Sequence, residues 1–412
     1  MTAGTVIVGA GQAGAQLATS LREAGYTEPI TLIGDEPHVP YHRPPLSKDY
    51  MAGKVPEAEL PIRTPEYYRE RTIALRTGVT ATRIHRDTRQ LALSGGEIMD
   101  YEHLVLATGA RNRRLDIPGG APANVYYLRT REDADALRTA LARARTVLIV
   151  GAGFIGLEFA SVAAAAGACA TVVAAGERVM DRAVSPEVSA FFTDRHRADG
   201  TEIRCGTTVE TFRRDRNGRV TGAYVDGVLH SADMVLVGIG VLPNSDLAAA
   251  AGLEVGNGIV VDARLATSDP AISAIGDCAA LRRGAGAEPV RVESVQNAAD
   301  QARFLARRIT GTAAEYDDLP WFWSHQAGAK LQIAGLAGPT DESVILGDPE
   351  AAQRFSVCRL REDVLTAVES VNSPGDHLAA RRLLTSGARV TGRDLRSPEF
   401  SLRTAGRAPA IA

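Results

Sequence analysis

Short apolar runs that end in glycine recur along this chain, and they predict strands that are buried on both faces. The first run, Thr5–Val8, leads into the turn Gly9-Ala10-Gly11-Gln12-Ala13-Gly14 and then into a helical pattern that continues to Ala24. A second apolar run, Ile30–Ile33, follows after Gly25. This order predicts a βαβ unit with G-x-G-x-x-G at its first turn, where backbone amides and a helix N-terminus can approach a pyrophosphate.

Acidic residues at the end of the second strand support a dinucleotide site. Asp35 and Glu36 come just past Ile33, and either carboxylate could accept a hydrogen bond from a ribose hydroxyl. A glycine-rich turn that arose by chance is the alternative. The complete order of strand, turn, helix and strand favours dinucleotide binding.

The same pattern occurs a second time, in "TVLIVGAGFIGLEFASVAAAAGACATVVAAGE". Its turn is Gly151-Ala152-Gly153-Phe154-Ile155-Gly156, and the strand expected after Gly167 is Ala168–Ala174. Two such units predict two dinucleotides in one α/β protein, which suits a flavin together with a nicotinamide. We therefore predict an electron-transfer flavoprotein.

Three further apolar runs end in glycine turns. The run 104–110 contains Ala107, Thr108 and Gly109, and the run 234–240 ends at Gly240; each is expected to close one nucleotide fold. A third run, 272–281, contains Gly276 and Asp277. Asp277 is predicted either to cap a helix or to lie where helix amides meet an anion, and both can hold.

Composition narrows the class of protein. The 412 residues are 45% apolar and 23% charged, with a net charge of −3, and they allow about two to four domains. This balance gives no sign of a nucleic-acid or membrane partner, although local patches are still allowed. We expect a cytoplasmic protein, because the sequence has no secretory signal and no run of about 18 apolar residues.

The four cysteines, at positions 169, 205, 278 and 358, lie far apart and form no C-x-x-C motif. This spacing argues against an iron–sulfur cluster, a zinc site or a thioredoxin-like dithiol, so we predict no metal and expect buried thiols.

Lys48, in "RPPLSK", is one of only three lysines among 46 basic residues. An ammonium is a compact point charge, whereas guanidinium is a planar fork, and the two differ where space is tight. A solvated lysine is the alternative to a functional one.

Seven motifs together carry a resemblance that spans nearly the whole chain: "RPPLSK", "LATGAR", "GAGFIGLE", "GVLPN", "TSDPAISAIGDCA", "ESVQNAADQA" and "WFWSHQAGAKLQIAGL". In this order they resemble those of the oxygenase-coupled ferredoxin reductases. The resemblance implies a glutathione-reductase-like fold with two Rossmann-like domains and a C-terminal α+β domain. It places FAD on residues 1–112 and 241–318, NAD(P)H on 113–240, and the third domain on 319–412.

The resemblance also assigns candidate catalytic residues. Lys48 matches a lysine that contacts the flavin ring near N5, where a cation stabilises negative charge on reduced flavin. Glu158 matches a residue that faces the nicotinamide and can pair with that lysine; a helix-start acid favoured by the dipole is the alternative. Trp323 is favoured narrowly over Trp321 as the residue against the flavin face, and both could instead be core residues.

The remaining FAD-contact positions follow from matching the motifs residue by residue. Arg129 is expected at the cofactor, with a surface charge before the helical stretch 132–142 as the alternative. The run Arg111–Arg114 is favoured as a solvated hinge over a phosphate contact. The matched positions are Ala13, Asp35, Arg43, Ala81, Arg129, Asp277 and Val295.

Two positions depart from the family pattern. Ala174 stands where the family's NADH enzymes usually have Glu, so selection against a 2′-phosphate is weakened. Glu177 comes three residues late. Arg178 could meet a phosphate, yet an Arg also occurs at this position in the family's NADH-type members, so the resemblance favours NADH while NADPH stays open. His325 stands where the family often has Asp, and we expect a structural hydrogen-bonding role for it.

The function implied is an FAD-dependent reductase that takes hydride from NAD(P)H and passes single electrons to a [2Fe–2S] ferredoxin serving a cytochrome P450 or a ring-hydroxylating dioxygenase. The alternative is a flavin oxidase or small-molecule reductase. A redox-sensing protein of the apoptosis-inducing-factor type is disfavoured, since no basic nucleic-acid signature or targeting segment is seen.

We expect a monomer or weak dimer whose ferredoxin docks near the flavin edge. A basic cluster is the candidate docking surface, and a solvated helix face is the alternative. It contains Arg381, Arg382, Arg389, Arg393 and Arg396.

Overall fold

The computed structural model describes residues 4–117, 122–284, 286–312 and 314–405. The chain forms two compact units, each built from three separate segments. The first unit comprises Met1–His42, Glu57–Arg111 and Val241–Asp318. The second comprises Arg43–Pro56, Asn112–Gly240 and Leu319–Ala412.

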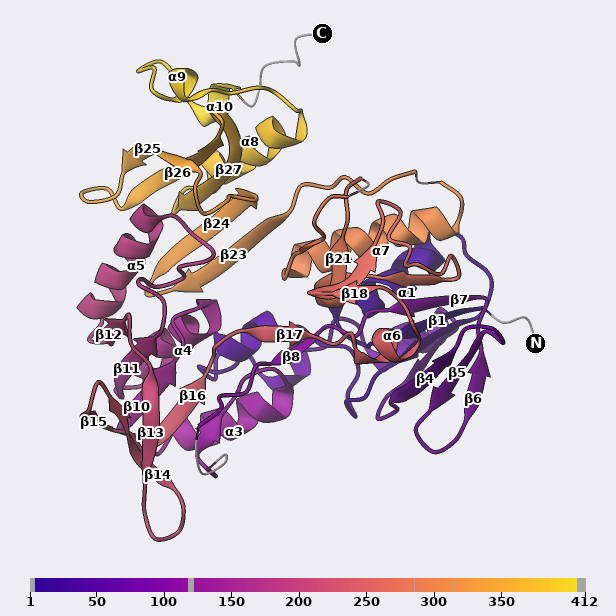
Figure 1. Cartoon of the computed structure of the whole chain (residues 1–412), viewed down its shortest axis with the longest axis horizontal. Helices are drawn as coiled ribbons and strands as arrows, with labels where there is room; N and C mark the ends of the chain where they lie inside the picture. Colours follow the sequence, from indigo (N-terminus) through magenta and orange to yellow (C-terminus); the bar gives the residue numbers. More distant parts are fainter. Residues whose placement is uncertain (1–3, 118–121, 285, 313, 406–412) are drawn as a thin grey trace. The chain divides into compact units, whose positions relative to one another are not determined.

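A five-stranded parallel sheet forms the centre of the first unit (Figure 1). Its order is β20-β7-β1-β2-β3, and the helices α1 and α7 pack against each other beside it. The central strand β1 is buried along its whole length, as its apolar run predicts. The bounds are β1 Thr5–Val8, β2 Ile30–Ile33, β3 Ile73–Arg76, β7 His103–Leu106, β20 Ile272–Ala274, α1 Gln12–Glu23 and α7 Val295–Ile309.

Smaller elements complete this unit. One three-stranded antiparallel sheet is β4 Ala81–His85, β5 Gln90–Leu93 and β6 Ile98–Asp100. A four-stranded sheet is β18 Val255–Gly256, β19 Gly258–Val261, β21 Ala279–Leu281 and β22 Val290–Arg291. The strands β8 Ala110–Asn112 and β17 Val241–Pro243 pair with each other. The short helices are α2 Pro65–Glu70, α6 Asp246–Ala250, η2 Glu57–Glu59 and η3 Gly276–Cys278.

The second unit contains another five-stranded parallel sheet, of order β12-β11-β10-β16-β9. A small antiparallel sheet, β13-β14-β15, lies between β12 and β16 in the chain, and η1 (Pro44–Ser47) also belongs to this unit. The bounds are β9 Val125–Tyr126, β10 Thr146–Val150, β11 Cys169–Ala174, β12 Glu202–Cys205, β16 Met234–Val237, β13 Val209–Arg214, β14 Val220–Val225, β15 Val228–Ser231, α3 Arg131–Leu141, α4 Phe154–Ala165 and α5 Pro186–Ala198.

An antiparallel sheet of order β23-β24-β27-β26-β25 ends the chain, and α8 packs on β24 and β27 (Figure 1). Strand β23 also contacts α4, so this sheet adjoins the second parallel sheet within the same unit. The bounds are β23 Trp321–Gln326, β24 Ala329–Gly335, β25 Glu342–Asp348, β26 Arg354–Arg361, β27 Val364–Val371, α8 Pro374–Thr385, α9 Gly392–Leu395 and α10 Leu402–Ala405.

Both predicted βαβ units are present, with small differences at their ends. The first helix stops at Glu23, one residue early, and the last strand of the second unit starts at Cys169, one residue late. The prediction that Asp277 caps a helix is wrong, because Ile275 holds that position and Asp277 lies inside η3. The expectation of four buried thiols is also wrong, since Cys169 is exposed and Cys205 is half-buried.

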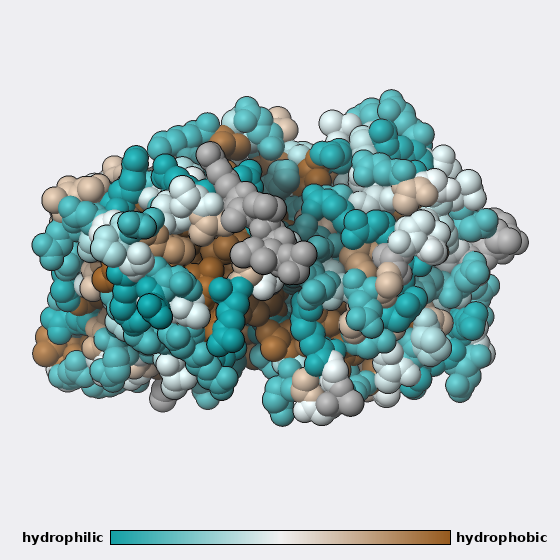
Figure 2. Space-filling view, turned by 90° about the horizontal axis from the view of Figure 1, so that it is seen from above, coloured by the Kyte–Doolittle hydropathy of each residue, from teal (hydrophilic) through white to brown (hydrophobic). Residues whose placement is uncertain are grey.

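Polar residues cover most of the face seen in Figure 2, and apolar residues appear between them as separated brown patches. Scattered surface hydrophobics of this kind are normal in folded proteins. Among the described residues, no helix is long and apolar enough to cross a membrane.

Candidate active site

The turn between β1 and α1 has the geometry of a phosphate cradle. Gly9 has φ +116°, and a Cβ at this position would lie 2.1 Å from Ala107 O. A Cβ at Gly14 would lie 2.0 Å from Gly9 O, so α1 can approach β1 only without a side chain there. A Cβ at Gly11 would meet nothing within 4 Å, which leaves open space beside the helix N-terminus. Gly9 therefore allows the tight turn, Gly11 leaves room for a ligand to approach, and Gly14 allows the helix to pack closely on the strand.

The turn between β10 and α4 repeats this arrangement. Gly151 has φ +110°, and a Cβ there would lie 2.3 Å from Gly238 O. A Cβ at Gly156 would lie 2.2 Å from Gly151 O, whereas Gly153 again faces open space. Both turns thus fit the diphosphate of a dinucleotide, in the part of the chain where each was predicted.

Several predicted contact residues of the first unit lie together. Gly276 has φ +75°, its N–H donates to Gln301 Oε1 at 2.7 Å, and a Cβ there would lie 3.1 Å from the Cβ of Ala13. Val295 is the first residue of α7 and follows the N-cap residue Ser294. Thr108 Oγ1 donates to Asn244 O at 2.6 Å and thereby ties the turn after β7 to the segment after β17.

The remaining predicted residues of this unit are placed as follows. The Glu36 carboxylate accepts a hydrogen bond from Tyr41 at 2.5 Å, while Asp35 is exposed. Ala81 begins β4 and is half-buried opposite Leu93.

The hinge residues Arg111, Arg113 and Arg114 are all exposed, as expected for a solvated run, and two of them also contact neighbouring groups. Arg111 donates to Pro243 O and Asn244 Oδ1 and lies 3.0 Å from Asp246. The Arg114 guanidinium lies 4.1 Å from the centre of the Tyr127 ring. Arg111 therefore fixes the segment after β17 in the first unit, and Arg114 packs on Tyr127 in the second unit.

A buried cluster of polar groups surrounds Glu158 in the second unit. Lys48 Nζ lies 2.6 Å from Glu158 Oε2, and the two side chains are 19% and 2% exposed. Ser47 Oγ donates to the same oxygen at 2.6 Å, and Ser324 Oγ donates to Oε1 at 2.6 Å. The adjacent prolines begin η1, Ser47 ends it and Lys48 is its C-cap, so the diproline places Ser47 and Lys48 on one short turn.

The position of Glu158 corrects one expectation. Helix α4 begins at Phe154, which makes Glu158 its fifth residue, beyond the first turn. A favourable interaction with the helix dipole fades within the first turn and does not explain a buried carboxylate here. Its three donors explain it instead, because a buried charge is tolerated only when it is paired and hydrogen-bonded.

Arg43 and Arg129 meet in the same unit, where the Arg43 guanidinium donates to Arg129 O at 2.5 Å. Arg129 precedes α3, whose capping box is formed by Thr130 and Asp133. The two predicted flavin contacts thus lie side by side.

The two tryptophans are half-buried rather than core residues. Trp321 lies between its neighbours in a stack: its ring centroid is 6.3 Å from that of Trp323 and 5.4 Å from that of His377, and the Arg381 guanidinium lies 4.4 Å from it. His325, which lies two residues after Trp323 on β23, is exposed.

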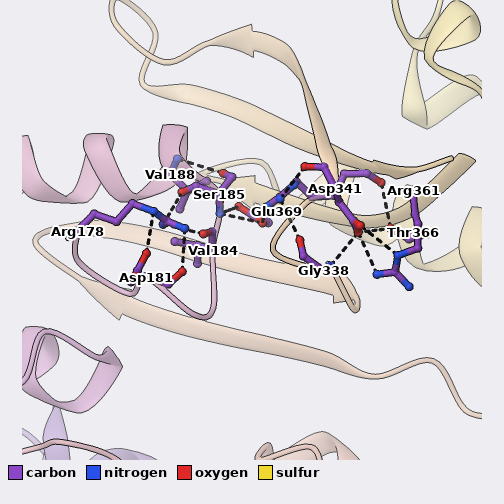
Figure 3. Close-up of polar contacts among 11 residues, drawn as sticks. Arg178, Asp181, Val184, Ser185, Val188, Gly338, Asp341, Arg361, Thr366 and Glu369 are labelled. Carbon is purple, nitrogen blue, oxygen red and sulfur yellow. Dashed lines mark hydrogen bonds and ion pairs between the residues drawn. The ribbon is translucent and has the colours of Figure 1, made fainter. Parts of the chain in front are cut away.

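The loop after β11 is braced by its own arginine (Figure 3). Arg178 donates to the backbone oxygens of Asp181, Val184 and Ser185, and Nε lies 3.1 Å from the Asp181 carboxylate. Most of its donors are therefore engaged inside the loop, which weighs against the predicted phosphate contact. Ala174 is buried at the end of β11, and Gly240 has φ +99° beyond β16.

Sequence analysis missed Ser47, Ser324 and Gln326. The signal that could have found them is position, because Ser47 precedes Lys48 in "RPPLSK" and Ser324 follows Trp323 in "WFWSHQ". It also missed Glu369 in β27, whose carboxylate accepts from the Ser185 N–H at 2.8 and 3.1 Å and braces the same loop (Figure 3).

Two phosphate cradles on parallel sheets, with a buried Lys–Glu pair in the second unit, define an oxidoreductase that uses two dinucleotides. The family model for pyridine nucleotide-disulphide oxidoreductases matches residues 4–302, and a reductase C-terminal model matches residues 321–406. The chain belongs to the pyridine nucleotide-disulphide oxidoreductase family. This family uses FAD and NAD(P)H, and both cradles fit those cofactors.

Its relatives match over nearly their full length. Rhodocoxin reductase of Rhodococcus erythropolis is 45% identical over 97% of this chain and 93% of the relative. Putidaredoxin reductase of Pseudomonas putida is 41% identical over 92% of this chain and 91% of the relative. The predicted resemblance to the ferredoxin reductases of oxygenase systems is confirmed, as is the fold class.

Two solved structures are similar over the whole chain. A ferredoxin reductase for the CYP199A2 system from Rhodopseudomonas palustris is 44% identical, with a TM-score of 0.94 over 98% of this chain and 99% of that one. The reductase in a covalent putidaredoxin reductase–putidaredoxin complex is 40% identical, with a TM-score of 0.94 over 98% of each chain.

Proposed function

We propose that this protein is an FAD-dependent NAD(P)H:ferredoxin reductase that supplies a [2Fe–2S] ferredoxin of a cytochrome P450 or ring-hydroxylating dioxygenase. The observation that carries this proposal is the pairing of Lys48 with Glu158, in a chain whose four cysteines form no C-x-x-C motif. Without a dithiol to take an electron pair, an outside one-electron carrier is the natural acceptor. Relatives named as redoxin or ferredoxin reductases support it over nearly their full length.

The first cradle would hold FAD and the second NAD(P)H. Flavin supplies the ability to accept a hydride and release two electrons singly. We assign FAD to residues 1–112 and 241–318, the nicotinamide coenzyme to 113–240 and the third domain to 319–412. The FAD contacts would be Gly9, Gly11, Ala13, Gly14, Asp35, Glu36, Arg43, Lys48, Ala81, Ala107, Thr108, Gly109, Arg129, Gly276, Asp277, Val295 and Trp321.

Lys48 and Glu158 would act together at the reacting end of the two cofactors. The Lys48 ammonium would offset the negative charge that hydride arrival brings, and Glu158 would hold that ammonium in a fixed position. Since Glu158 is almost fully buried, its other oxygen needs the Ser324 hydroxyl. Trp323 would exclude water beside this pair.

We favour NADH as the coenzyme, with relaxed selectivity. Ala174 ends β11 without the carboxylate that would repel a 2′-phosphate, while Arg178 is held by its own loop. Ala174 removes a carboxylate that would select NADH, and Arg178 is not available to select NADPH. We therefore expect weak discrimination between the two coenzymes.

The test measures flavin reduction by NADH and NADPH in stopped flow, followed by cytochrome c reduction with and without a [2Fe–2S] ferredoxin. We expect rapid flavin reduction and a cytochrome c rate that depends on ferredoxin. Rapid oxygen or quinone reduction without ferredoxin would support a flavin oxidase or small-molecule reductase instead.

A further inference from the structure

A series of buried hydrogen bonds extends from Glu158 to His196 in α5. Ser324 Oγ lies 2.6 Å from Glu158 Oε1, and Gln326 Nε2 lies 3.2 Å from Ser324 Oγ. Gln326 Oε1 then lies 2.9 Å from His196 Nε2. All four residues expose 3% or less of their surface.

The chemistry of the groups fixes the direction of these bonds. The Gln326 amide nitrogen also faces Met180 Sδ at 3.5 Å, so its donor side points at two acceptors. Ser324 Oγ accepts from this nitrogen, which commits its single hydrogen to Glu158. The Gln326 oxygen can only accept, so His196 carries its hydrogen on Nε2.

Every bond therefore points towards Glu158. Hydrogen bonds that share one direction polarise and strengthen one another in a buried site. The other carboxylate oxygen receives Ser47 and Lys48. Both oxygens of Glu158 thus accept hydrogen bonds from donors that other residues hold in place.

Separate contacts hold the series in register. Ser324 and Gln326 lie two residues apart on β23 and so share one face of the strand. The next residue, Ala327, is fixed at both backbone groups: its N–H donates to Ser161 Oγ at 2.9 Å, and its oxygen accepts from Arg195 at 2.7 and 3.1 Å. These contacts tie the end of β23 to α4 and α5.

We propose that His196, Gln326 and Ser324 form a one-directional donor series that orients the Glu158 carboxylate and keeps Lys48 paired with it. All three are positioning residues that act through Glu158. The C-terminal sheet thereby positions the Lys48–Glu158 pair in the parallel-sheet part of the same unit. This inference rests on the proposed function for its effect on hydride transfer, but not for its effect on Lys48 itself.

The first measurement is the NMR signal of the lysine side chain in the oxidised holoenzyme, labelled with 13C/15N-lysine. Only Lys48, Lys54 and Lys330 contribute signals, and Lys48→Arg assigns the first of them. We expect Ser324→Ala and Gln326→Leu to move the Lys48 signal while the other two signals stay.

Gln326→Glu tests the direction. It preserves size and polarity, but an ionised Glu accepts from Ser324 and so withdraws the hydrogen bond from Glu158. We expect it to move the Lys48 signal at least as far as Gln326→Leu. Ser324→Thr, which keeps the hydroxyl, should restore the wild-type position.

The second measurement is the rate constant of flavin reduction by NADH, which should fall about tenfold in Ser324→Ala, the fold-change expected for one lost hydrogen bond to a charged group. The matched control is Ser370→Ala. Ser370 is another buried serine of the same sheet, and within the described part of the chain its side chain bonds only to Ser356, so this variant should change neither measurement.

An unchanged Lys48 signal in both Ser324→Ala and Gln326→Glu overturns the donor series. If the signal moves but wild-type flavin is not reduced by NADH or NADPH, the series stands and the proposed function fails instead.

Discussion

Lys48 Nζ lies 2.6 Å from Glu158 Oε2, although the two residues are 110 positions apart in the chain. Lys48 caps the C-terminal end of the short η1 helix, and Glu158 lies inside α4. Their contact joins the "RPPLSK" motif to the second βαβ unit, and it gives a rare lysine a partner that is almost fully buried.

Replacement of Lys48 by Met should slow flavin reduction by NADH about 10–100-fold and lower the flavin midpoint potential, because the cation that offsets charge on reduced flavin is lost. The measurements are stopped-flow absorbance and a redox titration. The exposed Lys54 offers a control, and Lys54→Met should change neither quantity. Equal rates and potentials in the two variants would remove Lys48 from the reacting site.

Introduction of a carboxylate at the end of β11 should restore discrimination between coenzymes. In Ala174→Glu, the new side chain would accept from a ribose 2′-hydroxyl and repel a 2′-phosphate, so kcat/KM should fall at least about tenfold more for NADPH than for NADH. Ala175 is exposed next to it, and Ala175→Glu is the matched control. A ratio that changes equally in both variants would place Ala174 away from the ribose.

The sequence predicted the parallel sheets well because their strands follow a simple rule. Apolar runs such as Thr5–Val8 and Thr146–Val150 are buried on both faces and end at glycines whose backbone no other residue could adopt without a clash. The resemblance to known reductases then supplied the pairing of Lys48 with Glu158. Local pattern and motif order together were sufficient for these features.

The support around Glu158 could not be predicted in this way. Ser324 and Gln326 read as ordinary alternating positions of an edge strand, and His196 as a helix residue before a glycine turn. Their connection depends on how β23 packs against α4 and α5, which no local periodicity encodes. The same holds for Glu369, whose partner Ser185 lies 184 positions earlier.

The Glu369–Arg359 ion pair should be costly to break. Both side chains are buried, with N and O 3.1 Å apart, and Glu369 also receives the Ser185 N–H. Glu369→Leu leaves a buried guanidinium unpaired, so the free energy of unfolding should fall by about 3–5 kcal/mol. Denaturant unfolding of the holoenzyme measures this.

The double variant Arg359→Met/Glu369→Leu separates charge from packing. It removes both buried charges and should recover most of the loss. A double variant no more stable than Glu369→Leu would show that the cost arises from lost packing, and not from the unpaired guanidinium.

His377 should make stability depend on pH. It is buried against Trp321, and burial, with the charges of Arg381 and Lys330, lowers its pKa to about 4. The unfolded chain then binds a proton between about pH 6.5 and 4 that the folded protein does not, so stability falls as pH falls through this window. The loss reaches about 2–3 kcal/mol for this histidine.

His377→Phe keeps an aromatic ring on Trp321 without the titration. Thermal unfolding at pH 7 and pH 5 should show a smaller fall in Tm for this variant than for the wild type. Some dependence should persist, since burial also lowers the pKa of His103 to about 4. An undiminished fall would mean that His377 does not couple folding to protons.

The final prediction concerns the basic cluster of the C-terminal sheet and its helices. Arg381 is held over Trp321 and Arg396 is paired with Glu342, so these two are partly committed within the protein. Arg382 and Arg389 are exposed and are better candidates for an acidic ferredoxin. Charged rims raise the association rate and orient the encounter, and salt screens them.

Reversal of charge at both positions, in Arg382→Glu/Arg389→Glu, should lower kcat/KM for a [2Fe–2S] ferredoxin about tenfold at low ionic strength. The difference should shrink as salt is added, while ferricyanide reduction should stay unchanged because a small acceptor needs no docking surface. The control is Arg216→Glu/Arg219→Glu, which reverses two exposed charges beside the β13–β14 turn. If both pairs lower ferredoxin turnover equally, net charge governs the encounter and this cluster is a solvated helix face.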